Sequence, residues 1–317
     1  MRTITALFVG LGSIGTRHLK NLANLCADRG WTLQADALRS DLTRPLRPGA
    51  AELLHAQYTA PAAAPAHYDM VFITNPTSLH AAALRQVRGR GAALFIEKPI
   101  FSAEQTGLAL DELLPAGQKA YVAAPMRWCG AMLALKDRLP ALHPYCARVI
   151  CSSYLPDWRP GVDYRTVYSA RKALGGGVTI DLIHEWDYLV ELFGVPEKLY
   201  NFKGTYSELE IDSDDLSVYI AKYPTLLAEV HLDYFGRGYR RSIELFCRDG
   251  SYLADFGKGT LTLPDGTVQH YEEDVNRRYE REMEYFVDYA LTGCGESCNP
   301  PALALKVLKL TLGENVQ

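Results

Sequence analysis

The first 124 residues of the chain alternate between two hydrophobic patterns. Short runs of strand type lie at residues 3–9, 32–38, 70–74 and 92–96. Segments with helical spacing follow two of these runs, at residues 16–25 and 80–87. Strands that alternate with helices in this way predict a doubly wound parallel sheet, in an α/β domain of residues 1–124.

The pattern changes after residue 124. Strand-type runs then dominate, at residues 147–154, 199–206, 216–223, 227–234, 241–247, 251–255 and 260–263. Turn signals such as Arg248-Asp249-Gly250 separate them. This order predicts an α+β domain over residues 125–317 with a large open antiparallel sheet. Because an open sheet needs a cover, we expect a homodimer or a homotetramer.

Composition and charge exclude several classes of protein. The 317 residues are 48% hydrophobic and 22% charged, which suits two folded domains with sizeable cores. A net charge of -4 favours neither nucleic acid nor an anionic membrane as partner. No run approaches the ~20 apolar residues that span a bilayer, and the first residues lack a signal-peptide cleavage site, so we expect a cytoplasmic protein. The seven cysteines lack the spacing of a metal site, and no metal is expected.

A glycine motif joins the first predicted strand to the first predicted helix. It has the spacing G-x-G-x-x-G, in which Gly10 makes the turn, Gly12 lets backbone approach a pyrophosphate and Gly15 lets helix and strand pack closely. The helix N-terminus adds unpaired N–H groups that favour an anion. The motif therefore predicts a Rossmann domain that binds a dinucleotide through Gly10, Gly12, Ser13, Ile14 and Gly15.

The end of the second predicted strand bears on the choice of cofactor. An acidic residue at this tip usually holds the ribose of NAD, but Asp36 lies inside the strand, three residues before Arg39. Arg39 followed by Ser40 suits the 2′-phosphate of NADP. The sequence thus favours NADP over NAD as cofactor.

The carboxyl ends of two further strands carry polar residues. Ligands of parallel sheets bind at these ends. The candidates there are Thr74, Asn75, Pro76, His80, Glu97 and Lys98.

The second half contains a candidate acid–base pair. Three glycines at residues 175–177 precede a helix that we predict over residues 178–193. Asp181 and His184 lie one turn apart on its polar face, where a carboxylate and an imidazole make a workable acid–base pair.

A loop at residues 154–169 is rich in aromatic and charged residues. Such a composition suits a polar ring or an anionic group, and it equally suits a packed, ion-paired loop or an oligomer contact. Arg127 has a similar double interpretation, as an anion clamp or as an interdomain salt bridge. The candidate substrate-binding residues are Arg127, Trp158, Arg159, Tyr164 and Arg165.

Together these motifs resemble the Gfo/Idh/MocA oxidoreductases, which include glucose–fructose oxidoreductase and inositol dehydrogenase. The resemblance rests on FVGLGSIGTRH, NPTSLH, the EKP tripeptide at residues 97–99 and GGGVTIDLIHEWD in the second half. It implies that Lys98 is a catalytic acid/base, that Glu97 contacts the nicotinamide ribose, that Asp181 binds a substrate hydroxyl and that His184 completes the catalytic set.

The resemblance implies an NAD(P)-dependent oxidoreductase. Its hydride would pass between nicotinamide and a secondary alcohol or ketone carbon of a sugar, nucleotide sugar, sugar acid or cyclic polyol. Two alternatives stay open: a dinucleotide-sensing regulator without turnover, and a reductase of an imine, dihydrodiol or tetrapyrrole. The sequence leaves open whether Lys98 or His184 takes the proton, the direction of reaction and the substrate.

Overall fold

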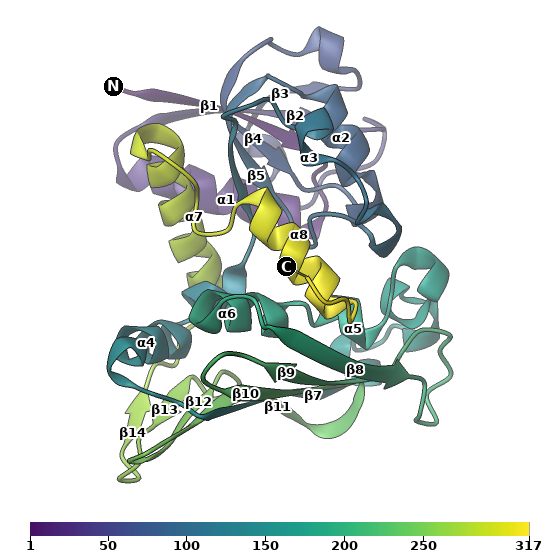
Figure 1. Cartoon of the computed structure of the whole chain (residues 1–317). Helices are drawn as coiled ribbons and strands as arrows, with labels where there is room; N and C mark the ends of the chain where they lie inside the picture. Colours follow the sequence, from purple (N-terminus) through teal and green to yellow (C-terminus); the bar gives the residue numbers. More distant parts are fainter. Residues whose placement is uncertain (317) are drawn as a thin grey trace. The chain divides into compact units, whose positions relative to one another are not determined.

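The computed structural model describes residues 1–316, which divide into two compact units (Figure 1). The first unit consists of residues 1–123 and 279–305, and the second of residues 124–278 with the segment from Lys306 onward. The chain leaves the first unit between Ala123 and Ala124, close to the expected boundary, but it returns to that unit later.

The first unit is built on a six-stranded parallel sheet in the order β3-β2-β1-β4-β5-β6. Its strands are β1 (Thr3–Val9), β2 (Thr32–Leu38), β3 (Leu54–Tyr58), β4 (Tyr68–Ile73), β5 (Gly91–Ile96) and β6 (Lys119–Val122). The strand order reverses between β1 and β4, and open α/β sheets bind their ligands at such a switch point. The predicted Rossmann architecture is therefore confirmed.

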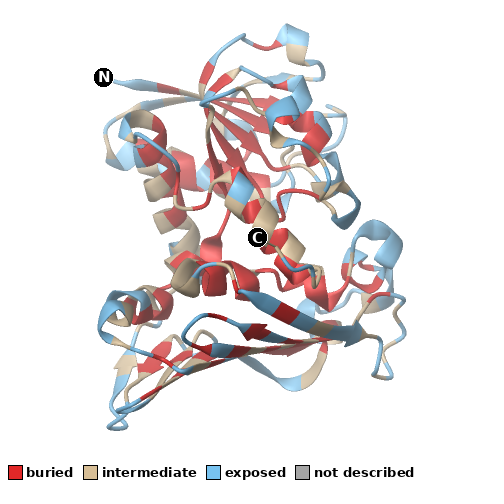
Figure 2. Ribbon diagram, in the orientation of Figure 1, coloured by how far each residue is buried: buried red, intermediate tan, exposed pale blue. Residues whose placement is uncertain are grey.

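Helices cover this sheet on both faces. They are α1 (Ser13–Asp28), α2 (His80–Gln86), α3 (Leu110–Leu113) and the later part of α7 (Val275–Thr292). In Figure 1, α1 and α7 lie on one side of the strands and α2 and α3 on the other. Phe286 of α7 packs against Phe72 and Phe95 of the sheet, with ring centroids 5.4 and 5.1 Å away. Strands β1, β4 and β5 between these layers are mostly buried, whereas the edge strand β3 has no buried residue (Figure 2).

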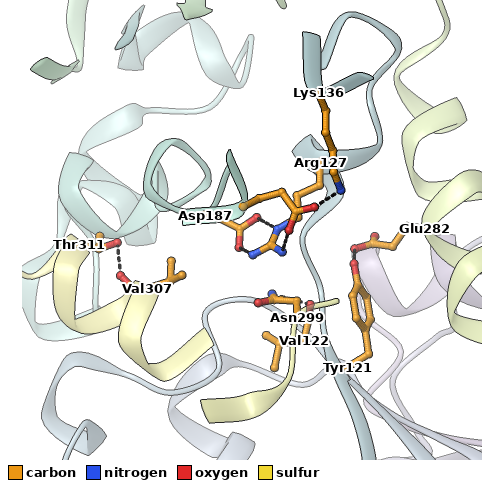
Figure 3. Close-up of polar contacts among 10 residues, drawn as sticks. Tyr121, Val122, Arg127, Lys136, Asp187, Glu282, Asn299, Val307 and Thr311 are labelled. Carbon is orange, nitrogen blue, oxygen red and sulfur yellow. Dashed lines mark hydrogen bonds and ion pairs between the residues drawn. The ribbon is translucent and has the colours of Figure 1, made fainter. Parts of the chain in front are cut away.

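Residues 279–305 were expected in the second domain, and the structure places them in the first unit. Besides the contacts of Phe286, this segment satisfies the edge strand β6. The Val122 N–H donates to the Asn299 carbonyl at 3.0 Å, and the Asn299 side chain donates to the Val122 carbonyl at 2.9 Å (Figure 3). A sheet edge with unpaired backbone groups gains from such a partner, which the local sequence pattern does not announce.

The second unit is built on an eight-stranded sheet in the order β14-β13-β12-β11-β7-β10-β9-β8. Its strands are β7 (Cys146–Tyr154), β8 (Lys198–Gly204), β9 (Leu216–Lys222), β10 (Leu227–Asp233), β11 (Phe235–Cys247), β12 (Gly250–Asp255), β13 (Thr260–Thr262) and β14 (Val268–His270). Neighbours are antiparallel except β7 and β10, which run parallel. The large, mostly antiparallel sheet confirms the predicted α+β class.

Helices α4 (Gly130–Arg138), α5 (Val178–Asp181) and α6 (His184–Phe193) lie on one face of this sheet (Figure 1). On strands β8 and β9, Tyr200, Phe202 and Ile220 are exposed, with 73% of Phe202 accessible. The last helix, α8 (Pro301–Thr311), ends in this unit, where the Thr311 carbonyl accepts the Tyr219 hydroxyl at 2.7 Å. No helix among residues 1–316 is long and apolar enough to cross a membrane.

One predicted helix is divided in two. A single helix was expected over residues 178–193, but α5 ends at Asp181 and α6 begins at His184. Between them the backbone tightens to i→i+3 bonds, from Ile183 to Ile180 and from Glu185 to Leu182, both 3.3 Å long. Short 3-10 helices occur elsewhere at Ala51–Leu53, Pro61–Ala63, Thr77–Leu79, Ala103–Gln105, Pro125–Trp128, Leu139–Ala141, Leu155–Trp158, Tyr164–Thr166, Tyr168–Ala170 and Lys172–Leu174.

Candidate functional site

The glycine turn after β1 is shaped by the end of β4. Gly10 has φ +90°, and a Cβ there would lie 2.8 Å from the Asn75 Cα. A Cβ on Gly15 would lie 2.6 Å from the Thr74 Oγ1, which itself donates to the Gly10 carbonyl at 2.6 Å. Both glycines are therefore required by close packing against residues 74–75.

Gly12 differs from these two glycines because a Cβ there would have no atom within 4 Å. It is the N-cap of the 16-residue helix α1, no side chain caps its N–H groups, and the first turn holds no acidic residue. Ser13 is exposed and Ile14 is half-buried beside it. Open backbone at an uncapped helix N-terminus fits the pyrophosphate of a dinucleotide.

Asp36 is turned into the protein at the second strand. It is buried, its Oδ2 accepts the Tyr68 hydroxyl at 2.7 Å, and its Oδ1 lies 3.2 Å from the His55 Nδ1. Strand β2 ends at Leu38, so Arg39 stands at the tip. The Arg39 guanidinium donates to the Gln57 Oε1 at 2.7 Å and to the Arg44 carbonyl.

A cavity of about 360 Å³ opens beside this tip. Arg39, Arg44 and Arg47 line it together with one acidic residue, Glu52, so its lining carries a net positive charge. Next to Arg39, Ser40 is exposed. Asp41 lies in the same loop, where hydrogen bonds from Thr43 and the charges of Arg44 and Arg39 lower the pKa of its carboxyl. The loop therefore offers cations for a phosphate and one carboxylate for a ribose.

His80 is a bridge between two strand-end loops. It is buried, with its Nδ1 3.1 Å from the Ile100 carbonyl oxygen and its Nε2 3.0 Å from the Asn75 carbonyl oxygen. Burial lowers the pKa of His80, although these hydrogen bonds act to raise it. His80 was expected to contact cofactor, and the structure instead uses both of its ring nitrogens inside the protein. Of its neighbours, Pro76 is exposed and Asn75 is half-buried.

Glu97 and Lys98 follow the end of β5. Glu97 is 7% exposed, and its Oε2 accepts the Lys98 backbone N–H at 3.0 Å. Its Oε1 lies 2.6 Å from the Nε2 of His18, a fully buried residue of α1. Sequence reasoning missed His18 as a site residue, although it ends the quoted motif FVGLGSIGTRH.

In the second unit, the glycine run packs against backbone and a capping carboxylate. A Cβ on Gly176 would lie 2.0 Å from the Tyr168 carbonyl oxygen, and one on Gly177, at φ +131°, would lie 2.3 Å from the Asp214 Oδ1. The Asp214 Oδ2 accepts the Thr179 N–H at 2.9 Å and so caps α5. These contacts fix the start of the helix that carries Asp181.

Asp181 and His184 belong to separate helices. Asp181 is the last residue of α5, is 8% exposed, and its Oδ2 accepts the Tyr234 hydroxyl at 2.5 Å. His184 is the first residue of α6 and is half-buried. Tyr234 was missed by sequence reasoning, because a tyrosine after a strand carries no signal of a partner 53 residues away.

Two buried arginines hold α6. The Arg241 Nε and Nη2 donate to the two oxygens of Glu185 at 2.7 and 3.0 Å. The Arg127 Nε and Nη2 donate to the two oxygens of Asp187 at 3.0 and 2.7 Å. Such bidentate pairs fix orientation as well as charge.

Arg127 also donates from Nη1 to Glu191 at 2.6 Å, and Glu191 pairs with Lys136 (Figure 3). Arg127 was expected as an anion clamp for substrate or as an interdomain salt bridge. Each of its guanidinium nitrogens donates to a carboxylate within the second unit. These contacts favour a structural ion pair over an anion clamp at Arg127.

The aromatic loop is held by contacts to neighbouring segments and by one ion pair of its own. Trp158 donates from Nε1 to the Ser153 Oγ at 3.0 Å, and its ring centroid lies 5.2 Å from that of Tyr234. Arg165 pairs with Asp163 at 2.9 Å and with Glu210 at 2.9 Å. This favours the ion-paired loop for Arg165, whereas Trp158, Arg159 and Tyr164 line one small pocket.

Residues 1–316 hold no group of three or more His, Cys, Asp or Glu side chains that could bind a metal ion. No cysteine of these residues forms a disulfide, and Cys294 is exposed whereas Cys26, Cys129, Cys151 and Cys247 are buried.

Comparison with known proteins also indicates a dinucleotide-binding fold for the first unit. Residues 4–123 match the family model of the Gfo/Idh/MocA proteins, described as an oxidoreductase family with an NAD-binding Rossmann fold. No curated protein matches the chain by sequence.

Solved structures resemble the chain over nearly its whole length. An oxidoreductase from Agrobacterium radiobacter, in complex with NAD+, L-tartaric acid and magnesium, is 17% identical, with 98% of this chain and 95% of that chain covered and a TM-score of 0.80. Myo-inositol 2-dehydrogenase from Lactobacillus plantarum is 19% identical, with coverage of 98% and 96% and a TM-score of 0.75. UDP-N-acetylglucosamine 3-dehydrogenase from Acidithiobacillus ferrooxidans is 19% identical, with coverage of 99% and 97% and a TM-score of 0.72. These structures share the fold of both units, and residues 4–123 match the model of the NAD-binding Gfo/Idh/MocA oxidoreductase family.

Proposed function

We propose that the chain is an NAD(P)-dependent dehydrogenase or reductase. It would transfer a hydride between nicotinamide and a secondary alcohol or ketone carbon of a sugar, nucleotide sugar, sugar acid or cyclic polyol. The observation that carries this proposal is the shape of the glycine turn after β1. Its backbone is open at Gly12, whereas Gly10 and Gly15 pack closely against residues 74–75. The names of the inositol and nucleotide-sugar dehydrogenases among the similar structures support the substrate class.

A bound nicotinamide would supply the hydride acceptor or donor. The chain's own contribution begins with the N–H groups at the start of α1, which would hold the pyrophosphate. In the oxidative direction, the Lys98 amine or the His184 imidazole takes the proton of the substrate hydroxyl, and the Asp181 carboxylate accepts a hydrogen bond from a hydroxyl. In the reductive direction, the same groups return a proton to the ketone oxygen. The assignment rests on these side-chain types and on the motif resemblance.

We propose NADP as the preferred cofactor. Arg39 stands at the tip of β2, and Arg39, Arg44 and Arg47 line one cavity, so a 2′-phosphate would meet three guanidinium groups. Asp36 is not placed to bind a ribose because Tyr68 and His55 take its oxygens. Asp41 remains the acidic residue of this loop that would favour NAD.

We also propose that the exposed face of the eight-stranded sheet mediates a homodimer or a homotetramer. Tyr200, Phe202 and Ile220 give that face an apolar end on β8 and β9. Light scattering coupled to gel filtration tests this, with Phe202→Asp expected to shift the protein toward monomer. An unchanged mass for the variant would place the contact elsewhere.

The first experiment is titration of the protein with NADPH and NADH, followed by nicotinamide fluorescence. Tighter binding of NADPH, lost in Arg39→Ala with little change for NADH, would support the cofactor assignment. Equal small effects on both cofactors would mean that Arg39 is a surface residue. Binding of neither would reject the dehydrogenase and favour a degenerate dinucleotide fold.

The second experiment screens sugars and polyols for turnover and then tests Lys98→Met. We expect the variant to keep its cofactor affinity and to lose about 10²-fold or more in kcat, the usual size of general acid–base catalysis. Lys258→Met changes an exposed lysine and serves as the control. Turnover by Lys98→Met near the wild-type rate would refute the role of Lys98.

A further inference from the structure

His18 is fully buried, and its imidazole makes one short polar contact. Its Nε2 lies 2.6 Å from the Glu97 Oε1, across 79 residues of sequence. The ring packs near Phe95, at 4.7 Å between centroids, and near Tyr279 of α7, at 6.1 Å. Its Nδ1 is buried without a hydrogen-bond partner among residues 1–316. The Glu97 contact is thus what satisfies this imidazole.

The Glu97 carboxylate connects that imidazole to the backbone of Lys98. One oxygen faces His18, and the other accepts the Lys98 N–H at 3.0 Å. From another side, the His80 Nδ1 lies 3.1 Å from the carbonyl oxygen of Ile100, two residues beyond Lys98. The segment 97–100 is therefore braced by a histidine from α1 and a histidine from α2.

The charge of Glu97 depends on its partners. Burial alone would raise the pKa of this carboxyl, but the hydrogen bond from His18 and the charges of His18 and Lys98 lower it below its ordinary value. His80 is a further titratable group that interacts with Glu97 electrostatically. A buried carboxyl without a cationic or donor partner takes up a proton instead. A protonated Glu97 would be a poorer acceptor for the Lys98 N–H.

We propose that His18 is a positioning residue: by holding Glu97 as a carboxylate bonded to the Lys98 N–H, it fixes the backbone from which the Lys98 amine extends. The pair of His18 and Glu97, called the dyad below, rests on contacts within the first unit. Its consequence for turnover rests on the proposed function.

The dyad is tested without substrate by ¹³C NMR of the full chain labelled at glutamate carboxyl carbons. The Glu97 signal is assigned from its loss in Glu97→Gln. In the wild type, we expect Glu97 to stay ionised from pH 5 to pH 8. In His18→Leu it should titrate at about pH 7–9, the range of buried glutamates without a partner. His18→Gln, whose amide can donate to the carboxylate, should restore ionisation.

Two further variants keep this test decisive. His18→Asn has a polar side chain that is one methylene shorter than that of His18→Gln, and it replaces His18→Leu if the latter fails to fold by circular dichroism. His270→Gln removes a comparable histidine–glutamate contact of 2.9 Å that is exposed, and should leave the Glu97 signal unchanged. An ionised Glu97 in both His18→Leu and His18→Asn would overturn the proposal.

The link to turnover is tested with NADPH and a substrate from the sugar screen. We expect His18→Leu to bind NADPH within about 3-fold of the wild type and to lose about 10-fold or more in kcat with KM unchanged, and His18→Gln to recover most of it. Failure of the wild type to bind either NADPH or NADH would reject the proposed function but not the dyad. A shifted Glu97 titration with unchanged kcat would overturn the positioning role alone.

Discussion

The Tyr234 hydroxyl donates a hydrogen bond of 2.5 Å to the Oδ2 of Asp181. Tyr234 is completely buried, and burial together with the charge of Asp181 raises its pKa well above the ordinary value. The phenol therefore remains a donor through the whole neutral range. The ring of Trp158 packs against that of Tyr234 at 5.2 Å, so the aromatic loop supports the same contact. Asp181 is thus held from outside its own helix.

Tyr234→Phe removes this donor while keeping the ring. Because a buried carboxylate loses a charge-assisted hydrogen bond, we expect the free energy of unfolding to fall by about 1.5–3 kcal/mol. Urea denaturation measures the change, with a substitution at an exposed tyrosine outside the proposed oligomer face, Tyr206→Phe, as control. Equal stability of Tyr234→Phe and the control would show that Asp181 does not depend on this hydroxyl.

Asp36→Ala separates the structural role of this carboxylate from a role in cofactor binding. The variant leaves the buried Tyr68 hydroxyl without its acceptor, so we expect it to be less stable by about 1–3 kcal/mol. The ratio of NADPH to NADH affinity should stay the same, since Asp36 points into the sheet. Urea denaturation and fluorescence titration measure the two effects. Weaker binding of NADH alone would instead place Asp36 in the cofactor site.

Much of the order of strands and helices in the first unit could be predicted because its signals are local, but β3 and the return of residues 279–305 to this unit were not predicted. The turn at Gly10 and the helix after Gly12 follow directly from the motif. In the second unit, local runs predicted most strands, but not the parallel pairing of β7 with β10, since pairing depends on partners far apart in sequence. The break between α5 and α6 was hidden because the apolar spacing continues through residues 182–183.

The site was predictable only in part, for the same physical reason. Residue types at strand ends indicated Glu97 and Lys98, and their positions agree with the structure. His18 and Tyr234 act through single contacts across 79 and 53 residues, and no local pattern encodes such contacts. The sequence did not distinguish the possible roles of Arg127, because an arginine bound by carboxylates has the same sequence signal as an arginine that binds an anion.

Arg127→Met is expected to destabilise the second unit strongly. It leaves the buried carboxylate of Asp187 without its bidentate partner and removes one of two cations from Glu191, which costs about 3–5 kcal/mol. Lys136→Met removes only a half-exposed partner of Glu191 and should cost less than about 1 kcal/mol. Urea denaturation of both variants at pH 7 measures the difference.

The loss of stability in Arg127→Met should depend on pH. Burial already raises the pKa of Asp187, against the charge of Arg127, which lowers it. A carboxyl whose folded pKa is raised favours the folded state below its unfolded value near 3.8, and this contribution is lost as the pH rises through the folded pKa. Without Arg127 the folded pKa rises further, so destabilisation should be smaller at pH 4.5 than at pH 7. An equal loss at both would mean that Asp187 is not the group left uncompensated.

Gly12→Ala and Gly15→Ala distinguish a backbone kept open for a ligand from one kept open for packing. A Cβ on Gly15 would meet the Thr74 Oγ1 at 2.6 Å and the Gly10 carbonyl oxygen at 2.7 Å, so Gly15→Ala should cost about 1–3 kcal/mol. A Cβ on Gly12 meets nothing within 4 Å, so Gly12→Ala should cost less than about 1 kcal/mol. Gly12→Ala should nevertheless weaken the binding of NADPH by about 10-fold or more, because the added methyl group would occupy the space of the pyrophosphate. Urea denaturation and fluorescence titration measure both, with Gly107→Ala as an equally open control. Wild-type NADPH affinity in Gly12→Ala would show that the pyrophosphate does not approach this turn.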